Sequence, residues 1–290
     1  LVLLAPLTSL YDGIYRGLKQ FKKLSVITVL TGIFSIIFSY YLVTKYGLFG
    51  AFLAQNLFYL LLTFILAIGY KDFNFKFNKE IIKEITNYSL LIGISSIGYF
   101  LYTRVDILVL GHFGYIEEIG YYEIINKIFM FILTPIFLLG TVIAPNTTRN
   151  FALKKYAYIK DKIRKEIISI FFLGLITAIL SYFFFPLIFR NFLNEYDIVL
   201  LTIILNLILI IVPFRFVSSY LSIGYITPGG FAKITSVTLV LFGLVNLILD
   251  IIFISRFGFI GVIYATLISQ FLYILSKDIY FYFRIIKKLN

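Results

Sequence analysis

The chain has 290 residues, of which 61% are hydrophobic and 14% are charged, and its mean hydropathy is +0.98. Soluble domains carry about 25% charged residues, so this composition excludes a soluble enzyme and indicates a polytopic membrane protein. The net charge of +12 is interpreted as loop charge on one side of a membrane and not as a nucleic-acid surface. With no cysteine and a single histidine, His112, the sequence excludes disulfides, multi-histidine metal sites and a Ser-His-Asp triad.

Apolar runs predict nine membrane segments. The first, residues 1–10, is about half the length of a span and is interpreted as the end of a helix that begins earlier. The other eight are long enough to cross ~30 Å of hydrocarbon as helices, and they lack the alternation of β-barrel strands. The predicted fold class is therefore all-α, a polytopic transmembrane helical bundle. The eight full segments are residues 24–44, 47–68, 88–110, 120–144, 167–189, 199–223, 234–254 and 258–283.

Connections rich in basic residues alternate with connections poor in them along this series. Twenty of the 26 Lys and Arg residues fall on one side, and that set includes Lys277 near the C-terminus. The opposite side holds only Lys45, Arg190 and Arg256. Because Lys and Arg concentrate in cytoplasmic loops, the C-terminus is predicted to lie in the cytoplasm and the protein in the cell membrane.

Two connections carry additional predictions. Residues 78–88 place isoleucines on one side and charged residues on the other, which predicts an interfacial amphipathic helix. Residues 149–165 are predicted to form a basic cytoplasmic loop that binds anionic membrane lipids.

An internal repeat relates two parts of the chain. Residues 13–61 align without gaps on residues 224–272 at a constant offset of 211 residues. The matched identities include the pairs Gly32 and Gly243, Gly47 and Gly258, Gly50 and Gly261, and Ala54 and Ala265.

Since an even number of segments separates the copies, the repeat is parallel, an arrangement known in secondary transporters. The chain is then predicted to be the C-terminal two thirds of a two-lobe protein of twelve helices, with about 125 residues preceding Leu1. Residues 1–70 would end an N-terminal six-helix lobe, residues 71–87 would form a cytoplasmic amphipathic linker, and residues 88–290 would form the C-terminal six-helix lobe.

Several stretches resemble a known family: YDGIYRGLKQFKKLS at residues 11–25, YGLFGAFLA at 46–54 with its copy FGFIGVIYA at 257–265, and RVDILVLGHFGYIEEIGYYEIINKI at 104–128. They are similar to polysaccharide exporters, the Wzx- and PST-type flippases of lipid-linked oligosaccharides. These belong to the MOP superfamily, which also contains the MurJ flippase and the MATE exporters. The resemblance implies two six-helix bundles around a central cavity, and alternating access that flips polyprenyl-(pyro)phosphate-linked oligosaccharides across the cytoplasmic membrane for polysaccharide biosynthesis. The missing N-terminal helices depart from that pattern.

Five ionisable residues fall inside predicted spans: Arg104, Asp106, Glu123, Lys127 and Arg215. Each costs about 2.5–3.5 kcal/mol at the bilayer centre, so we expect them to face a cavity or one another. Guanidinium and ammonium groups attract phosphate, which makes Arg104, Lys127 and Arg215 the candidate substrate-binding residues. Asp106 and Glu123 are the candidates for coupling to H⁺ or Na⁺.

Other readings of these charges remain open at this point. Glu123 and Lys127 could form a local i,i+4 ion pair, and Arg104 and Lys127 could extend to the outer headgroups. Arg215 follows Pro213, where a helix break would free backbone carbonyls. Asp250 is ranked below Asp106 and Glu123 because it is predicted to lie near a helix end.

The predicted partners are a lipid-linked oligosaccharide, membrane lipids and a coupling H⁺ or Na⁺. No catalytic residue, cofactor, metal or nucleic acid is expected, and no Walker A sequence is present. One alternative function is a MATE-like, ion-coupled exporter of small molecules, although a net positive cavity would repel cationic drugs. A membrane-embedded glycosyltransferase or polymerase is the other alternative, against which the short external loops argue.

Overall fold

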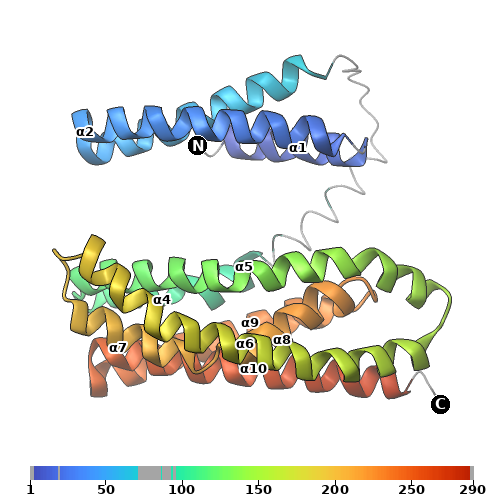
Figure 1. The fold of residues 1–290 in the computed structure, drawn as a ribbon. Coiled ribbons are helices and arrows are strands. Elements are labelled where there is room, and N and C mark those ends of the chain that lie inside the picture. The colour runs from blue at the N-terminus through green and yellow to red at the C-terminus, as the bar shows by residue number, and fades with distance from the viewer. Residues whose placement is uncertain (1–2, 19, 71–85, 87–92, 94–95, 288–290) are drawn as a thin grey trace. The chain divides into compact units, whose positions relative to one another are not determined.

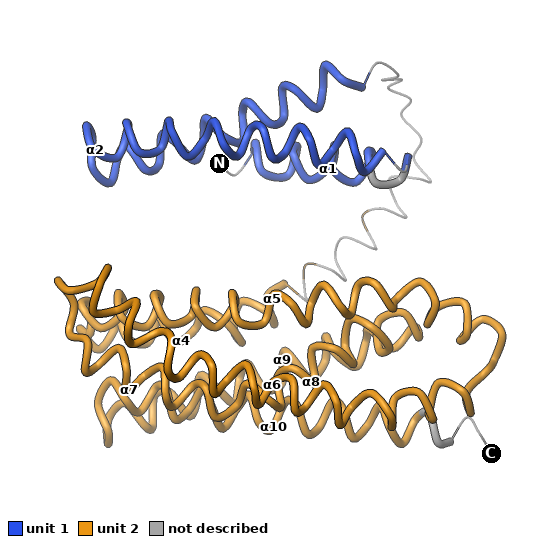
Figure 2. The backbone as a smooth tube through the Cα atoms, viewed as in Figure 1, with its two compact units in different colours: residues 1–82 blue, residues 83–290 orange. Residues whose placement is uncertain are grey.

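The computed structural model describes residues 3–18, 20–70, 86, 93 and 96–287. The described residues contain helices and no strand, so the predicted all-α fold is confirmed (Figure 1). The chain divides into two compact units, Leu1–Ile82 (unit 1) and Lys83–Asn290 (unit 2), coloured separately in Figure 2. The elements are α1 (Leu4–Gly17), α2 (Phe21–Ile68), α4 (Val105–His112), α5 (Ile116–Ala152), α6 (Tyr156–Phe192), α7 (Ile198–Leu209), α8 (Val212–Leu221), the π-helical η1 (Ser222–Ile226), α9 (Ala232–Phe257) and α10 (Phe259–Lys287).

Unit 1 is a helical hairpin with α1 packed along it. Helix α2 breaks at Gly47, where φ is 56° and ψ is −133°, and the chain turns back on itself there (Figure 1). Its two arms correspond to the predicted spans 24–44 and 47–68. The hairpin is closed against α1 by Tyr15, whose side chain is buried and whose hydroxyl donates a hydrogen bond of 3.1 Å to the carbonyl of Leu66.

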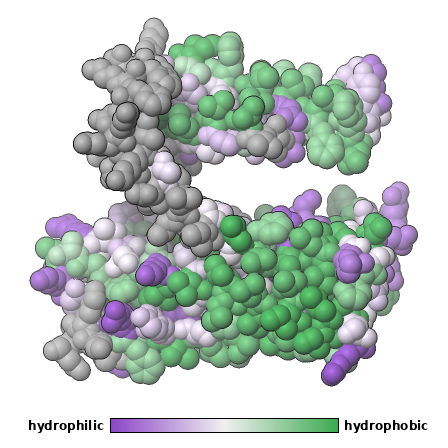
Figure 3. All heavy atoms as spheres, turned by 180° about the vertical axis from the view of Figure 1, so that it is seen from behind, coloured by the Kyte–Doolittle hydropathy of each residue, from purple (hydrophilic) through white to green (hydrophobic). Residues whose placement is uncertain are grey.

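Unit 2 is a bundle of helices that run back and forth along one axis. The connections α4–α5, α6–α7 and α9–α10 lie at one end of the unit, whereas the α5–α6 connection and the end of α10 lie at the other (Figure 1). Buried apolar residues from every helix of the bundle form one continuous core. Hydrophobic side chains cover the middle of the face seen in Figure 3, and hydrophilic ones gather toward the two ends. This distribution is the one that a bilayer requires of a spanning bundle.

The helices long and apolar enough to cross a membrane are α2, α5, α6, α9 and α10, and α7 with α8 and η1 forms a sixth candidate that is bent by 49°. The bend precedes Pro213 at the start of α8, as predicted. Of the predicted span 88–110, residues 96–103 and α4 are described, and both are helical. Helix α1 has 14 residues, fewer than a full span.

The repeat predicted from the sequence extends to the geometry of the turns. Gly258, between α9 and α10, has φ 61° and ψ −147°, close to the values of Gly47. Glycine is required at both, because left-handed conformations disfavour any residue with a Cβ atom. Three residues later, a Cβ on Gly50 would lie 1.9 Å from the carbonyl oxygen of Leu42, and one on Gly261 would lie 2.2 Å from that of Phe253. Leu42 and Phe253 are themselves 211 positions apart, so the two hairpins turn in the same way.

One of the two predicted connections is corrected. Residues 149–165 do not form a loop, because α5 continues to Ala152 and α6 begins at Tyr156. The 37-residue lengths of α5 and α6 exceed what ~30 Å of hydrocarbon requires, so their basic ends project beyond it as helix. The predicted amphipathic helix at 78–88 lies, except for Thr86, outside the described residues.

Candidate functional site

A cavity of about 310 Å³ lies within unit 2, among α4, α5, α8, α10 and the helical residues 96–103. All five ionisable residues that the sequence places inside the membrane line this cavity. They are Arg104, Asp106, Glu123, Lys127 and Arg215. They come from three separate stretches of sequence, so their meeting follows from the fold. Charged side chains at membrane depth are stable when they share a polar cavity, and this makes the cavity the candidate functional site.

Arg104 and Glu123 form an ion pair across two helices. Arg104 lies at the turn before α4, and its Nη1 is 2.6 Å from Oε1 of Glu123 on α5. The open reading that paired Glu123 with Lys127 on the same helix is therefore replaced by a pair with Arg104. Lys127 is exposed, and no described residue forms an ion pair with it. The cavity thus presents one neutralised arginine and one ammonium group without a counter-charge.

Asp106 is the centre of a buried hydrogen-bond network. Its side chain is 2% exposed and accepts hydrogen bonds from the hydroxyl of Tyr122, from the amide of Asn246 and, at 3.1 Å, from the hydroxyl of Thr266. These donors come from α5, α9 and α10, so the carboxylate ties α4 to three other helices. Both oxygens of the Asp106 carboxylate accept hydrogen bonds, which fixes its position.

Asp250 belongs to the same network, although the sequence predicts it near a helix end. It lies on α9 one turn after Asn246, is fully buried, and accepts a hydrogen bond of 3.2 Å from the Asn246 amide. The same Asn246 amide also donates to Asp106, so the two carboxyl groups share one donor. Asp250 is buried because α9 continues to Phe257, beyond the predicted end of the span, and packs against α10. Two neighbouring buried carboxyl groups are stable together only when a proton or a cation neutralises one of them.

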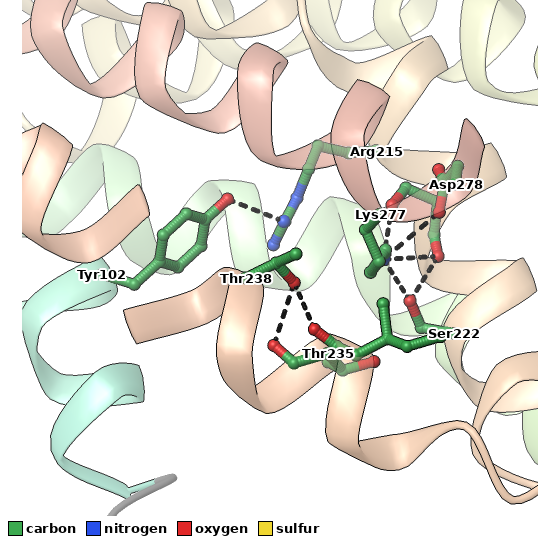
Figure 4. Close-up of polar contacts among 9 residues, drawn as sticks. Tyr102, Arg215, Ser222, Thr235, Thr238, Lys277 and Asp278 are labelled. Atoms are coloured by element: carbon green, nitrogen blue, oxygen red, sulfur yellow. Dashed lines mark hydrogen bonds and ion pairs between the residues drawn. The ribbon is translucent and has the colours of Figure 1, made fainter. Parts of the chain in front are cut away.

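Arg215 enters the cavity from the break between α7 and α8. Its Nη1 donates a hydrogen bond of 3.3 Å to the hydroxyl of Tyr102, and its guanidinium carbon lies 6.0 Å from the centre of that ring (Figure 4). None of the described residues accepts a hydrogen bond from its Nε, which is buried. Arg215 therefore retains hydrogen-bonding capacity for a ligand.

Lys277 is a buried cation that the loop-charge pattern misassigned. The pattern places it among the cytoplasmic loop residues, but it lies within α10 and its side chain is 1% exposed. Its Nζ donates hydrogen bonds to the hydroxyls of Ser218, at 2.7 Å, and of Ser222. Counting charges near a chain end cannot reveal this burial, which depends on α8 and η1, more than fifty residues away in sequence.

Uncharged polar groups complete the lining of the cavity. They include the hydroxyl groups of Tyr99 and Thr103 and the amides of Asn126 and Gln270. Tyr99 is 53% exposed and offers a ring face together with its hydroxyl. Cations beside amides, hydroxyls and an aromatic ring suit a ligand that joins an anionic group to a polar, ring-containing one. No cluster of three or more metal-ligating side chains occurs in the part of the chain that is described.

The family model described as "Polysaccharide biosynthesis protein" matches residues 1–151, half of the chain. The chain belongs to this family. Its fold is similar to that of a solved structure described as lipid II flippase MurJ in an inward closed conformation, with a TM-score of 0.75 and 20% identity over 99% of this chain. It is also similar to an outward-facing MATE-family multidrug resistance transporter of the MOP superfamily, with a TM-score of 0.65 and 18% identity over 98% of this chain. No match was found among curated proteins.

The comparisons confirm the predicted polysaccharide biosynthesis family and a fold similar to those of MurJ and a MATE transporter. The chain spans 63% of the MurJ chain and 66% of the MATE chain. It is therefore a multi-pass membrane protein of the polysaccharide biosynthesis family whose described part has a MurJ- and MATE-like fold.

Proposed function

We propose that the protein moves a polyprenyl-(pyro)phosphate-linked oligosaccharide from the cytoplasmic to the external leaflet of the cell membrane, by alternating access, during polysaccharide biosynthesis. The observation that carries this proposal is the meeting of Arg104, Lys127 and Arg215 in one cavity of about 310 Å³. The anionic linkage must leave the headgroup layer, and guanidinium and ammonium groups offset that cost by charge-assisted hydrogen bonds. Neither an enzymatic step nor a cofactor is part of the proposal.

In this mechanism a coupling ion, H⁺ or Na⁺, binds at Asp106. Asp250 and Asn246 support this role, because the second carboxyl group supplies the negative charge that a bound cation or a shared proton neutralises. Since Asp106 bridges α4 to α5, α9 and α10, ion binding there would alter how these helices pack. Glu123 has a different part: its carboxylate holds Arg104, and its neutralisation would release Arg104 toward a phosphate.

The proposed orientation places the C-terminus and the α5–α6 connection in the cytoplasm. The concentration of basic residues at that end supports it. The parallel repeat supports a two-lobe transporter in which residues 1–70 belong to an N-terminal lobe, 71–87 to a linker and 88–290 to a C-terminal lobe. The cavity of unit 2 would then be the contribution of the C-terminal lobe to the transport path.

An ion-coupled exporter of cationic small molecules is the second candidate. The carboxyl groups of Asp106 and Asp250, joined through Asn246, favour it, because neighbouring buried carboxyl groups also suit a cationic ligand. Against it, Asp106 is engaged by three donors and Asp250 is not among the residues that line the cavity, while the lining groups with free capacity, Lys127 and Arg215, are cationic.

The proposal is tested by measuring export of lipid-linked sugar in cells that depend on the full-length protein. We expect Arg104→Ala, Lys127→Ala and Arg215→Ala each to lower export by about tenfold or more, since a hydrogen bond to a charged group contributes about 1.5–3 kcal/mol. Arg256→Ala is the control, because Arg256 is exposed in the last turn of α9, outside the cavity. Unimpaired export by all three cavity variants at normal expression would refute the proposal.

A further inference from the structure

The internal repeat supplies a comparison for Lys277 within the molecule. Both second arms continue as helix past the aligned residues, and at the same offset of 211 residues the position that corresponds to Lys277 is Leu66. Both side chains are 1% exposed, and both lie on the second arm of their hairpin. A buried leucine therefore satisfies this position of the hairpin, and the lysine is a departure that the fold does not require. Because burying an ammonium group costs free energy, a lysine in place of a leucine at this position indicates a function for its charge.

The surroundings of Lys277 form a set of hydrogen-bond donors. Its Nζ contacts the hydroxyls of Ser218 and Ser222, where α8 passes into the π-helical η1 (Figure 4). The nearest counter-charge is Asp278, whose Oδ1 is 3.5 Å from the ammonium nitrogen, longer than a close ion pair. Three ammonium protons and two rotatable hydroxyls on adjacent helices can turn together toward the oxygens of one anion.

Two buried tyrosines connect this cluster to the cavity. Tyr102, which lines the cavity, and Tyr273 have ring centres 4.9 Å apart. Arg215 lies beside the ring of Tyr102, and Nζ of Lys277 lies 4.8 Å from the centre of the Tyr273 ring. Each ring of this aromatic pair thus contacts one cation. Tyr273 also corresponds to an apolar residue of the first copy, Leu62, so the pair too is specific to unit 2.

We propose that Lys277, with the hydroxyls of Ser218 and Ser222, is a second anion-binding site that takes the phosphate or pyrophosphate group of the transported lipid before it reaches the cavity. The Tyr102–Tyr273 pair contacts the cations of both sites, Arg215 and Lys277. In this conformation the ammonium group of Lys277 interacts with the two serine hydroxyls and with Asp278. This inference rests on the proposed transport of an anionic lipid and adds a site to it.

The absence of cysteine from the chain permits a direct test. Ser222→Cys places the only thiol of residues 1–290 beside Lys277, where a small neutral methanethiosulfonate reagent can label it in inverted membrane vesicles. The measured quantity is the labelling rate without an anion divided by the rate with it, which cancels any effect of Lys277 on the reactivity of the thiol. The anions are inorganic pyrophosphate and farnesyl diphosphate, and uncharged farnesol is the control.

We expect farnesyl diphosphate to slow labelling by about tenfold, because hydrogen bonds to a charged group are the strong ones. Protection should persist in Lys277→Arg and vanish in Lys277→Leu, the residue that the first copy carries. Lys233→Leu, a matched change at an exposed lysine, should keep the protection. Melting of each variant in detergent checks that it is folded, and Lys277→Arg tests the charge even if Lys277→Leu does not fold.

Other outcomes would overturn the inference. Labelling that neither diphosphate slows, or protection that survives in a folded Lys277→Leu, would mean that Lys277 only holds α8 against α10. A thiol that is never labelled would mean that the cluster does not open. Protection by inorganic pyrophosphate at lower concentration than by farnesyl diphosphate would assign the site to a free anion. The labelling assay does not measure transport, so the two proposals can fail separately. Labelling could be unprotected while export still depends on Arg104, Lys127 and Arg215, or protected while export does not depend on them.

Discussion

The two hairpins of the repeat, the arms of α2 in unit 1 and α9 with α10 in unit 2, share one backbone plan. Gly47 and Gly258 adopt the same left-handed turn, and Gly50 and Gly261 bring the second arm against a carbonyl of the first. These glycines and the apolar residues around them are sufficient to build the hairpin, because both copies have them.

The same hairpins differ in the polar residues that they carry. Where unit 2 has Asn246, Asp250 and Lys277, unit 1 has Ser35, Ser39 and Leu66. The second copy alone places an amide, a carboxyl and an ammonium group in its buried interior. The comparison teaches that the backbone of the hairpin serves the fold and that these substitutions serve the site.

The largest effect on stability is expected from replacing the glycines that pack the two arms of each hairpin. Gly261→Ala would place a methyl group 2.2 Å from the Phe253 carbonyl oxygen, and Gly50→Ala would repeat that clash at Leu42. Each should destabilise its hairpin by about 3 kcal/mol, the upper range for overpacking. Thermal unfolding in detergent measures this. Gly120→Ala, whose added Cβ meets no described atom within 4 Å, should be neutral or slightly stabilising. Equal melting of all three variants would contradict the shared turn.

The next effect concerns the carboxyl group that only the second copy has. Asp250→Ser introduces the residue that occupies the corresponding position of unit 1, Ser39, and leaves Asp106 without its neighbouring carboxyl group. We expect the dependence of transport on the coupling ion to weaken by about 10- to 100-fold in ion concentration, the range for losing a supporting ligand group. Transport is measured at varied pH and varied Na⁺. Glu117→Gln, an exposed change at the start of α5, is the control, and an unchanged ion dependence in Asp250→Ser would separate Asp250 from coupling.

A smaller effect is expected where an aromatic residue replaces an aliphatic one. Tyr273→Leu copies Leu62 of unit 1 and removes the ring contact with Tyr102 and the cation–π contact with Lys277. Unit 2 should lose about 1–2 kcal/mol of stability. Tyr280→Leu, at a half-exposed position of the same helix, should change the melting temperature less. The reverse order would argue against a packed aromatic pair.

The smallest effect is expected at the lysine that ties the ends of the first hairpin. Lys23 is exposed, donates a hydrogen bond of 3.0 Å to the Gly69 carbonyl and lies 5.3 Å from the centre of the Tyr15 ring. Because solvent screens such contacts, Lys23→Leu should cost about 1 kcal/mol or less, with transport unchanged. A loss of transport as large as that from Arg215→Ala would contradict the assignment of function to the lysine and arginine side chains that line the cavity of unit 2.

The spans, the break before Pro213 and the two matching turns could be predicted from the sequence, because hydrocarbon thickness, proline and glycine act locally. The convergence of Arg104, Asp106, Glu123, Lys127 and Arg215 was expected for a less local reason, the cost of a charge facing lipid.

The rest of the site depends on packing between distant segments. Glu123 pairs with Arg104 because α4 and α5 lie side by side, an arrangement that the i,i+4 spacing to Lys127 does not reveal. The burial of Asp250 and Lys277 could not be predicted from their positions near the end of a span or of the chain. The repeat does distinguish them, since the corresponding residue of the first copy carries no charge in either case.

The central claim is that the cations of the cavity move an anionic glycolipid. Its most direct test is the purified full-length protein in proteoliposomes, with a polyprenyl-pyrophosphate-linked oligosaccharide as the substrate and appearance of the sugar in the opposite leaflet as the measurement. The account predicts flipping under an ion gradient, its loss in Arg215→Ala, and no competition from a cationic drug. Transport of the cationic drug with no movement of the glycolipid would contradict it.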